Sequence, residues 1–129
     1  MDNKAIEILT NVRETTLELI EVIGEENDAI VNKDTASFKG ILSRKYDLMR
    51  KYDGLSLELS SIVEEIRTEN KAELDELIKL TEKLTAICDI NTKLLSREQD
   101  IALNIMSVMK EVADESSGDA DSGFVSVKA

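Results

Sequence analysis

The chain contains no proline among its 129 residues, and apolar residues recur at steps of three and four along most of its length. Proline breaks helices because it lacks a backbone N–H and clashes with the preceding turn, so its absence lets helices run long. Only two short breaks, near Lys33 and near Asn70, interrupt the apolar rhythm. The sequence therefore predicts an all-α fold, an elongated antiparallel three-helix bundle or coiled coil with a long third helix.

The two breaks give three predicted helices, over about residues 3–32, 35–69 and 71–113. At the first break, Asn32 is expected to adopt the left-handed conformation that ends a helix. Asp34 is expected to cap the next helix, because its carboxylate can accept hydrogen bonds from free backbone N–H groups.

The second break is less sharply marked than the first. Asn70 and Glu73 have the spacing of a capping box, in which Asn70 caps the third helix and Glu73 reaches back to the Asn70 backbone. The alternative is one continuous helix from Thr35 to Ala113.

Residues 1–113 are predicted to form one helical bundle, and residues 114–129 a flexible acidic tail. The tail is rich in small and acidic residues, which cannot bury a core. Phe124, Val125 and Val127 form an apolar tip near its end. This tip is either a docking segment or, as is commoner for terminal apolar residues, incidental.

Polar residues within the apolar stripes suggest how the helices are aligned. If the chain folds back at the two breaks, Arg13 faces Asp53, and Lys45 comes within a turn of Glu98. We expect ion pairs between these residues, which fix the register more than they stabilise the fold.

The charge of the chain bounds its partners. The formal net charge is −11, with no basic segment. Nucleic acid and anionic membrane surfaces attract clustered Lys and Arg, so neither is an expected partner. No apolar run is long enough to span a bilayer, and the N-terminus lacks the core of a signal peptide. A single cysteine, Cys88, allows no internal disulfide, which is typical of the cytoplasm.

Catalysis is not expected from this chain. It contains no histidine, which excludes His-based acid–base chemistry and the Glu-x-x-His pairs of di-iron bundles. Carboxylate pairs such as Glu25-Glu26 and Glu64-Glu65 are interpreted as solvated helix faces. Cys88 is interpreted as a small core residue. We expect no cofactor and no metal site.

The helix lengths point to a binding surface instead. Thr35 should lie beside about Asn104, while the third helix continues to about Ala113, so about eight or nine residues, roughly 12–14 Å, would extend past the first turn. The apolar residues of this overhang are Ile105, Met106, Val108, Met109 and Val112. An uncovered apolar helix rich in Met is typical of surfaces that accept partner helices. A weak homodimer and a fraying terminus are the alternatives.

Several stretches together resemble a known family. The first predicted helix ends in Glu26-Asn27-Asp28 before Lys33-Asp34, the second carries Lys45, Leu48 and Tyr52, and the third has Asn91 and Leu94-Leu95 before a small-residue tail. Over about residues 5–113, the chain resembles the FlgN family of flagellar export chaperones.

This resemblance implies a cytoplasmic chaperone of the flagellar type III secretion system. Such proteins bind hook–filament junction proteins before export, prevent their premature association and help deliver them to the export gate, so export-apparatus components are further candidate partners. In the family the client-binding region lies towards the C-terminal helix, which maps here onto about Leu94 to Val112.

The expected mechanism is capture of a client helix in a groove, with an apolar face and an acidic rim. The expected partner-binding residues are Leu94, Asp100, Ile101, Ile105, Met106, Val108, Met109, Glu111 and Val112. Two alternatives remain at this stage: a structural coiled-coil protein that assembles with itself, and a regulatory adaptor without a secreted client.

Overall fold

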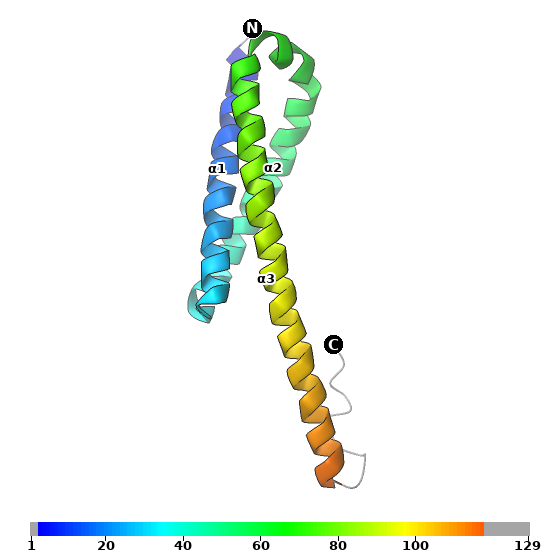
Figure 1. Ribbon diagram of the computed structural model, residues 1–129. Coiled ribbons are helices and arrows are strands. Elements are labelled where there is room, and N and C mark those ends of the chain that lie inside the picture. Colours follow the sequence, from blue (N-terminus) through cyan, green and yellow to red (C-terminus); the bar gives the residue numbers. More distant parts are fainter. Residues whose placement is uncertain (1–2, 118–129) are drawn as a thin grey trace. The chain divides into compact units, whose positions relative to one another are not determined.

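The computed structural model describes residues 3–117, which form three α-helices and no β-strand: α1 (Asn3–Val31), α2 (Thr35–Glu69) and α3 (Lys71–Ser117) (Figure 1). The three helices pack together, and the predicted all-α class is confirmed. The tail beyond Ser117, with its apolar tip, lies outside the described residues.

The third helix ends later than the sequence suggested. It continues through Asp114 to Ser117, whereas a tail was expected from Asp114 onward. Glu is a good helix former, Asp and Ser are only moderately poor ones, and no glycine lies between Asp114 and Gly118. A composition that cannot bury a core can therefore still continue an existing helix.

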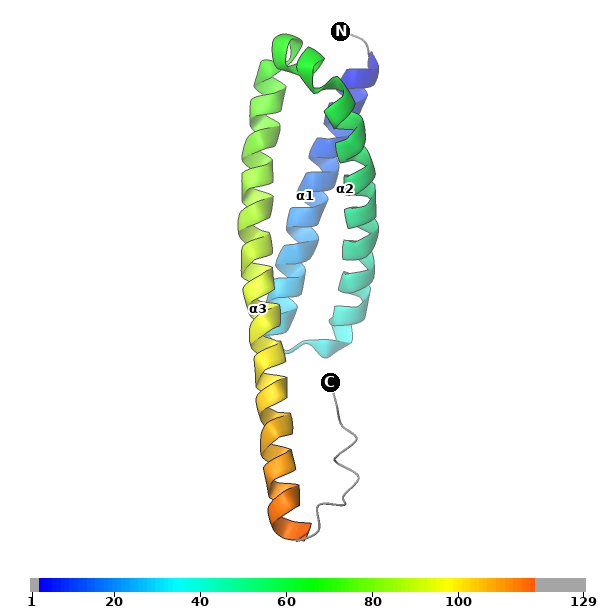
Figure 2. The same ribbon diagram turned by 90° about the vertical axis from the view of Figure 1, so that its right-hand side faces the viewer.

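The chain divides into two units, Met1–Leu94 and Leu95–Ala129. In the first unit, α1, α2 and the first half of α3 lie side by side (Figure 2). Successive helices run antiparallel, so α1 and α3 run parallel to each other. This is the arrangement expected from short links between helices.

The turn between α1 and α2 is formed by Asn32, Lys33 and Asp34. The Asp34 side chain accepts a hydrogen bond from the Ser37 backbone N–H at 3.3 Å, which confirms the predicted cap. The left-handed residue is Lys33, with φ of 56°, and not the expected Asn32. Asn32 still donates a helical hydrogen bond to the Asp28 carbonyl at 2.9 Å, so the reversal comes one residue later.

A single residue, Asn70, separates α2 from α3, so the helix is not continuous there. The predicted capping box does not form. The Asn70 N–H donates to the Ile66 carbonyl at 2.7 Å, so it is not bonded by the Glu73 side chain as a capping box requires. The Asn70 side-chain oxygen is buried and has no hydrogen-bond partner among the described residues.

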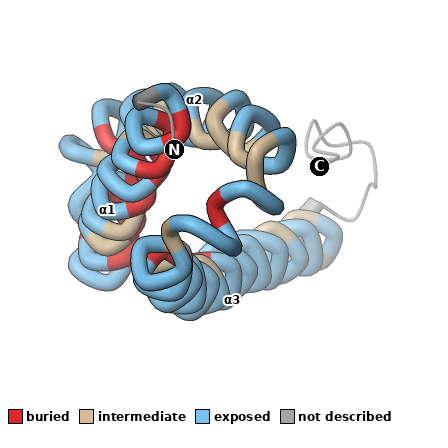
Figure 3. The backbone as a smooth tube through the Cα atoms, turned by 90° about the horizontal axis from the view of Figure 1, so that it is seen from above, coloured by how far each residue is buried: buried red, intermediate tan, exposed pale blue. Residues whose placement is uncertain are grey.

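The core of the first unit is centred on α1, whose wide apolar stripe contacts both neighbours (Figure 3). One cluster of buried residues consists of Leu19, Val22, Ile23, Ala29, Ile41 and Leu84. A second consists of Ile8, Leu9, Val12, Ile66 and Leu77. Cys88 is half-buried and packs against the first cluster. Burial raises the pKa of its thiol, and the positive charge of the nearby Lys45 acts in the opposite direction.

Both predicted ion pairs are wrong in their partners. The Arg13 Nε atom lies 3.0 Å from Glu76 Oε1 on α3, and does not pair with Asp53 on α2. Lys45 pairs with Glu26 and not with Glu98. For Arg13 the physical reason is that α1 and α3 are direct neighbours in the first unit, a contact that the expected pairs left out. For Lys45 the partner comes from α1, whereas the expected partner was on α3.

Lys45 instead belongs to a buried polar cluster. Its Nζ atom lies 2.8 Å from Glu26 Oε1 and donates a hydrogen bond to Asn91 Oδ1 at 3.1 Å. Asn91 Nδ2 in turn donates to Asn27 Oδ1 at 2.9 Å. The Glu26 side chain is fully buried, and its Oε2 has no hydrogen-bond partner within residues 3–117. The cluster joins all three helices at one level, which fixes their register.

Candidate partner-binding surface

The stretch of α3 in the second unit, from Leu95 to Ser117, is uninterrupted helix with no glycine. Its large apolar side chains are mostly exposed. Seven of them are between 38% and 58% exposed: Leu95, Ile101, Leu103, Ile105, Val108, Met109 and Val112. A run of exposed apolar side chains of this kind marks an interaction site more often than an ordinary solvated surface.

Four of these residues form one line along the helix, which we call the C-terminal stripe: Ile101, Ile105, Val108 and Val112. Their steps of four, three and four place them on a single face. Met109 borders the stripe, and half-buried Met106 lies further round the helix. The flexible Met side chain can adapt to partners of different shape.

Charged side chains border the stripe. Asp100 and Glu111, predicted as an acidic rim, are both exposed. From residue 95 to residue 117 there are two basic residues, Arg97 and Lys110, against five acidic ones, so the stretch carries a net charge of −3.

The structure thus places eight of the nine predicted residues in the second unit, and the four of the stripe share one face. Leu94 is the exception, because it is half-buried and belongs to the first unit. Leu95 and Leu103 are exposed apolar residues that the prediction left out. Leu103 lies off the stripe, but so does the predicted Met106, so it is the exposure in the structure that adds Leu95 and Leu103 to this surface.

The family model of the FlgN protein matches residues 1–118. The chain belongs to the FlgN family. FlgN proteins are a family of flagellar export chaperones and are not enzymes. No curated protein and no solved structure matches the chain.

Two further features concern the described residues as a whole. No group of three or more His, Cys, Asp or Glu side chains in residues 3–117 is arranged to hold a metal ion. In the same range, no helix is both long and apolar enough to cross a membrane.

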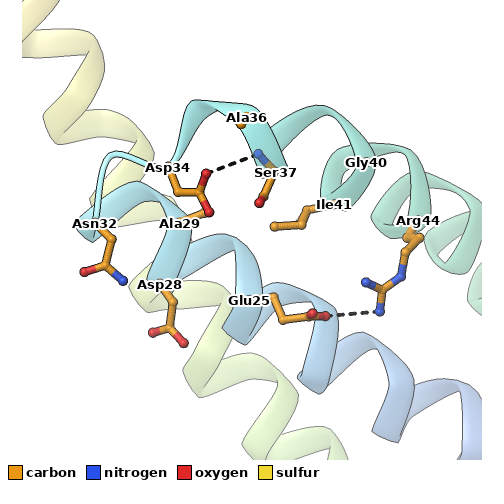
Figure 4. Close-up of a pocket in the computed structure, with 10 residues that line it drawn as sticks. All are labelled: Glu25, Asp28, Ala29, Asn32, Asp34, Ala36, Ser37, Gly40, Ile41 and Arg44. Carbon is orange, nitrogen blue, oxygen red and sulfur yellow. Dashed lines mark hydrogen bonds and ion pairs between the residues drawn. The ribbon is translucent and has the colours of Figure 1, made fainter.

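The first unit of this FlgN protein has a hollow of about 600 Å³ beside the turn between α1 and α2 (Figure 4). Its carboxylates include Glu25, which lies 3.1 Å from the Arg44 guanidinium, and Asp34, which holds the Ser37 N–H. These interactions hold the turn together. The hollow is therefore interpreted as part of the turn and not as a binding site.

Proposed function

We propose that this FlgN protein is a cytoplasmic chaperone that binds hook–filament junction proteins through the C-terminal stripe of α3. Binding would keep the clients from associating before export and would aid their delivery to the export gate. The family supplies the class of function. The single observation that supports this particular surface is the run of exposed apolar side chains from Ile101 to Val112.

The spacing of the stripe suits a helical client. An amphipathic helix presents apolar side chains at steps of three and four, and it is recognised by a partner with matching apolar rows. Ile101, Ile105 and Val108 supply such a row over two turns of α3. No chemical step is needed, because covering the apolar face of the client prevents its self-association.

The acidic surroundings of the stripe favour a client helix with basic residues at its edges. Exposed charges at the rim of an interface change the association rate and the partner choice more than the affinity. We expect client association to slow as the salt concentration rises, because salt screens exposed charges beyond about 8 Å at physiological ionic strength.

The test is titration calorimetry of the purified chain with a purified hook–filament junction protein. The double variant Ile105→Asp plus Met109→Asp puts two charges on the proposed surface, and we expect the affinity to fall at least about 100-fold, since a buried unpaired charge is strongly unfavourable. Truncation after Ser107, which removes Val108, Met109 and Val112, should have a similar effect.

A matched control is available in the first unit. Leu57 and Ile78 are exposed apolar residues, at 75% and 48%, so Leu57→Asp plus Ile78→Asp makes the same chemical change elsewhere. This control should bind the client normally. Equal binding by the Ile105→Asp plus Met109→Asp variant and by the unmodified chain would exclude the stripe as the client surface.

A further inference from the structure

The two turns of this FlgN protein are built very differently. The turn between α1 and α2 is held by several specific bonds: Asp34 N–H donates to the Ala29 carbonyl at 2.9 Å, and the Asp34 side chain caps α2. The left-handed Lys33 reverses the chain. A turn with its own bonds is a defined local structure.

The junction at Asn70 has a different pattern of backbone bonds. Its two backbone hydrogen bonds, from Asn70 N–H to the Ile66 carbonyl at 2.7 Å and from Leu74 N–H to the Asn70 carbonyl at 3.0 Å, both have the spacing of an ordinary α-helix. The backbone angles of Asn70, φ −131° and ψ 48°, depart from those of a helix. The break between α2 and α3 therefore falls at this one residue.

A straight junction would satisfy more of the backbone than the bent one. A helix that begins at Lys71 leaves its first N–H groups without intrahelical partners. The Asn70 side chain does not supply one, because its oxygen has no hydrogen-bond partner in the described part of the chain. If Asn70 became helical, the N–H groups of Lys71 and Ala72 would meet the carbonyls of Arg67 and Thr68.

The residues around the junction also favour a straight helix. From Glu64 to Leu74 the chain contains no glycine and no proline, and Glu, Arg, Lys, Ala and Leu predominate. The bend is therefore held by packing of α3 in the first unit, chiefly by the buried residues Leu77, Leu84 and Asn91. Those contacts do not require α3 to belong to the same copy of the chain.

We propose that Asn70 is a hinge through which two copies of the chain exchange α3. In the exchanged form, α2 and α3 make one continuous helix, and α3 of each copy packs on α1 and α2 of the other. The contacts of Leu77, Leu84 and Asn91 are then reproduced between copies, so the only new local structure is the straight junction. This inference does not depend on the client surface.

The first experiment measures mass against concentration by light scattering on a sizing column. The monomer has a mass of 14.4 kDa, and the exchanged dimer would have twice that. Asn70→Ala favours the straight junction and removes no side-chain bond, whereas Asn70→Gly favours the bend. We expect dimer dissociation to occur at a concentration at least about ten-fold lower for Asn70→Ala than for Asn70→Gly, from the helix propensities of these residues. Asn32→Ala, at the other turn, is the matched control and should leave the mass unchanged.

The second experiment identifies the kind of dimer. Arg13 and Glu76 lie on the exposed surface with Nε and Oε1 3.0 Å apart, so cysteines there can be joined by a short bismaleimide. In a Cys88→Ser background, chains with Arg13→Cys alone and chains with Glu76→Cys alone are unfolded together, refolded and treated with the reagent. Exchange predicts covalent heterodimers.

A chain that carries both Arg13→Cys and Glu76→Cys is the control for reactivity, since its monomer should become cross-linked internally without a gain in mass. Two outcomes would overturn the proposal. In one, Asn70→Ala and Asn70→Gly have the same mass at every concentration. In the other, dimers form but the mixed single-cysteine chains give no covalent heterodimer, which would indicate side-by-side association of intact monomers.

Discussion

One helical position, repeated every seven residues along α3, has opposite surroundings in the two units. In the first unit it is occupied by Leu77, Leu84 and Asn91, each 9% exposed or less, and in the second by Glu98, Ile105 and Val112, which are all exposed. The residue types change little between the two stretches. The comparison teaches that an apolar repeat shows which face of a helix needs a partner, but not whether the partner lies in the same chain.

The largest effect is expected at the polar cluster that joins the buried half of α3 to α1 and α2. Lys45→Ala should lower the free energy of unfolding by about 3–5 kcal/mol, because it leaves the fully buried Glu26 without its cation. Chemical denaturation measures this change. Arg44→Ala is the control, since the Arg44–Glu25 pair is about half exposed and should contribute about 0–1 kcal/mol. Similar losses for both variants would contradict the assigned role of the cluster.

The next effect compares the repeated position directly. Leu84→Ala should destabilise the protein by about 2–5 kcal/mol, because it opens a cavity in the core. Ile105→Ala should change the free energy of unfolding by less than about 0.5 kcal/mol, because the side chain is more than half exposed. Denaturation of the two variants beside the unmodified chain tests this. If Ile105→Ala costs as much as Leu84→Ala, the two stretches of α3 do not differ in the way described.

The polar members of the repeat should differ as well. Asn91→Leu should cost about 1–3 kcal/mol, because Asn27 and Lys45 would lose their hydrogen-bond partner inside the core. Glu98→Leu should leave the free energy of unfolding nearly unchanged but promote self-association by enlarging the exposed apolar surface. Denaturation and light scattering measure the two effects. A stabilising Asn91→Leu would mean that the polar cluster sets register at a net cost in stability.

The smallest effect is a gain of stability in the first unit. Gly54→Ala should raise the free energy of unfolding by about 1 kcal/mol, because a Cβ there meets no other atom within 4 Å and Ala is the better helix former. Client binding should not change, since the proposed surface lies in the second unit. A loss of client affinity in this variant, measured by calorimetry, would show that binding involves α2.

Much of the fold could be predicted because it depends on local patterns. The absence of proline and the spacing of apolar residues determine that helices form, and the two breaks determine where the chain turns. The Asp34 cap was also predictable, because a short carboxylate at the start of a helix acts on its own N–H groups three residues away.

The partners of the polar side chains could not be predicted in the same way. Arg13 pairs with Glu76, which is distant in sequence, because α1 and α3 are parallel neighbours. Asn70 and Glu73 have the spacing of a capping box, yet the Asn70 N–H donates to the Ile66 carbonyl and not to the Glu73 side chain. A motif states which bonds are possible, and competing partners decide which of them form.

The candidate surface falls between these cases. The surface was predicted because the last helix was expected to extend past the first turn and because the chain resembles the FlgN family, and the apolar side chains of the stripe from Ile101 to Val112 are exposed. Leu103 was left out of the predicted surface, and the end of α3 was placed at Ala113 because Asp114 to Ser117 have nothing to bury. A helix can continue past its last packed turn at little cost in free energy, so the end of an apolar pattern does not mark the end of the helix.

By itself, the sequence determined that this FlgN protein is helical, where its helices begin and which of their faces are apolar, because these properties depend on residues within about one turn of each other. The tertiary structure decided that Glu26, Lys45, Asn27 and Asn91 share one buried cluster and that Asn70 forms no capping box with Glu73. These outcomes depend on which helices become neighbours. The packing of the first unit as a whole determines which helices are neighbours, so this cannot be predicted from any single segment of the chain.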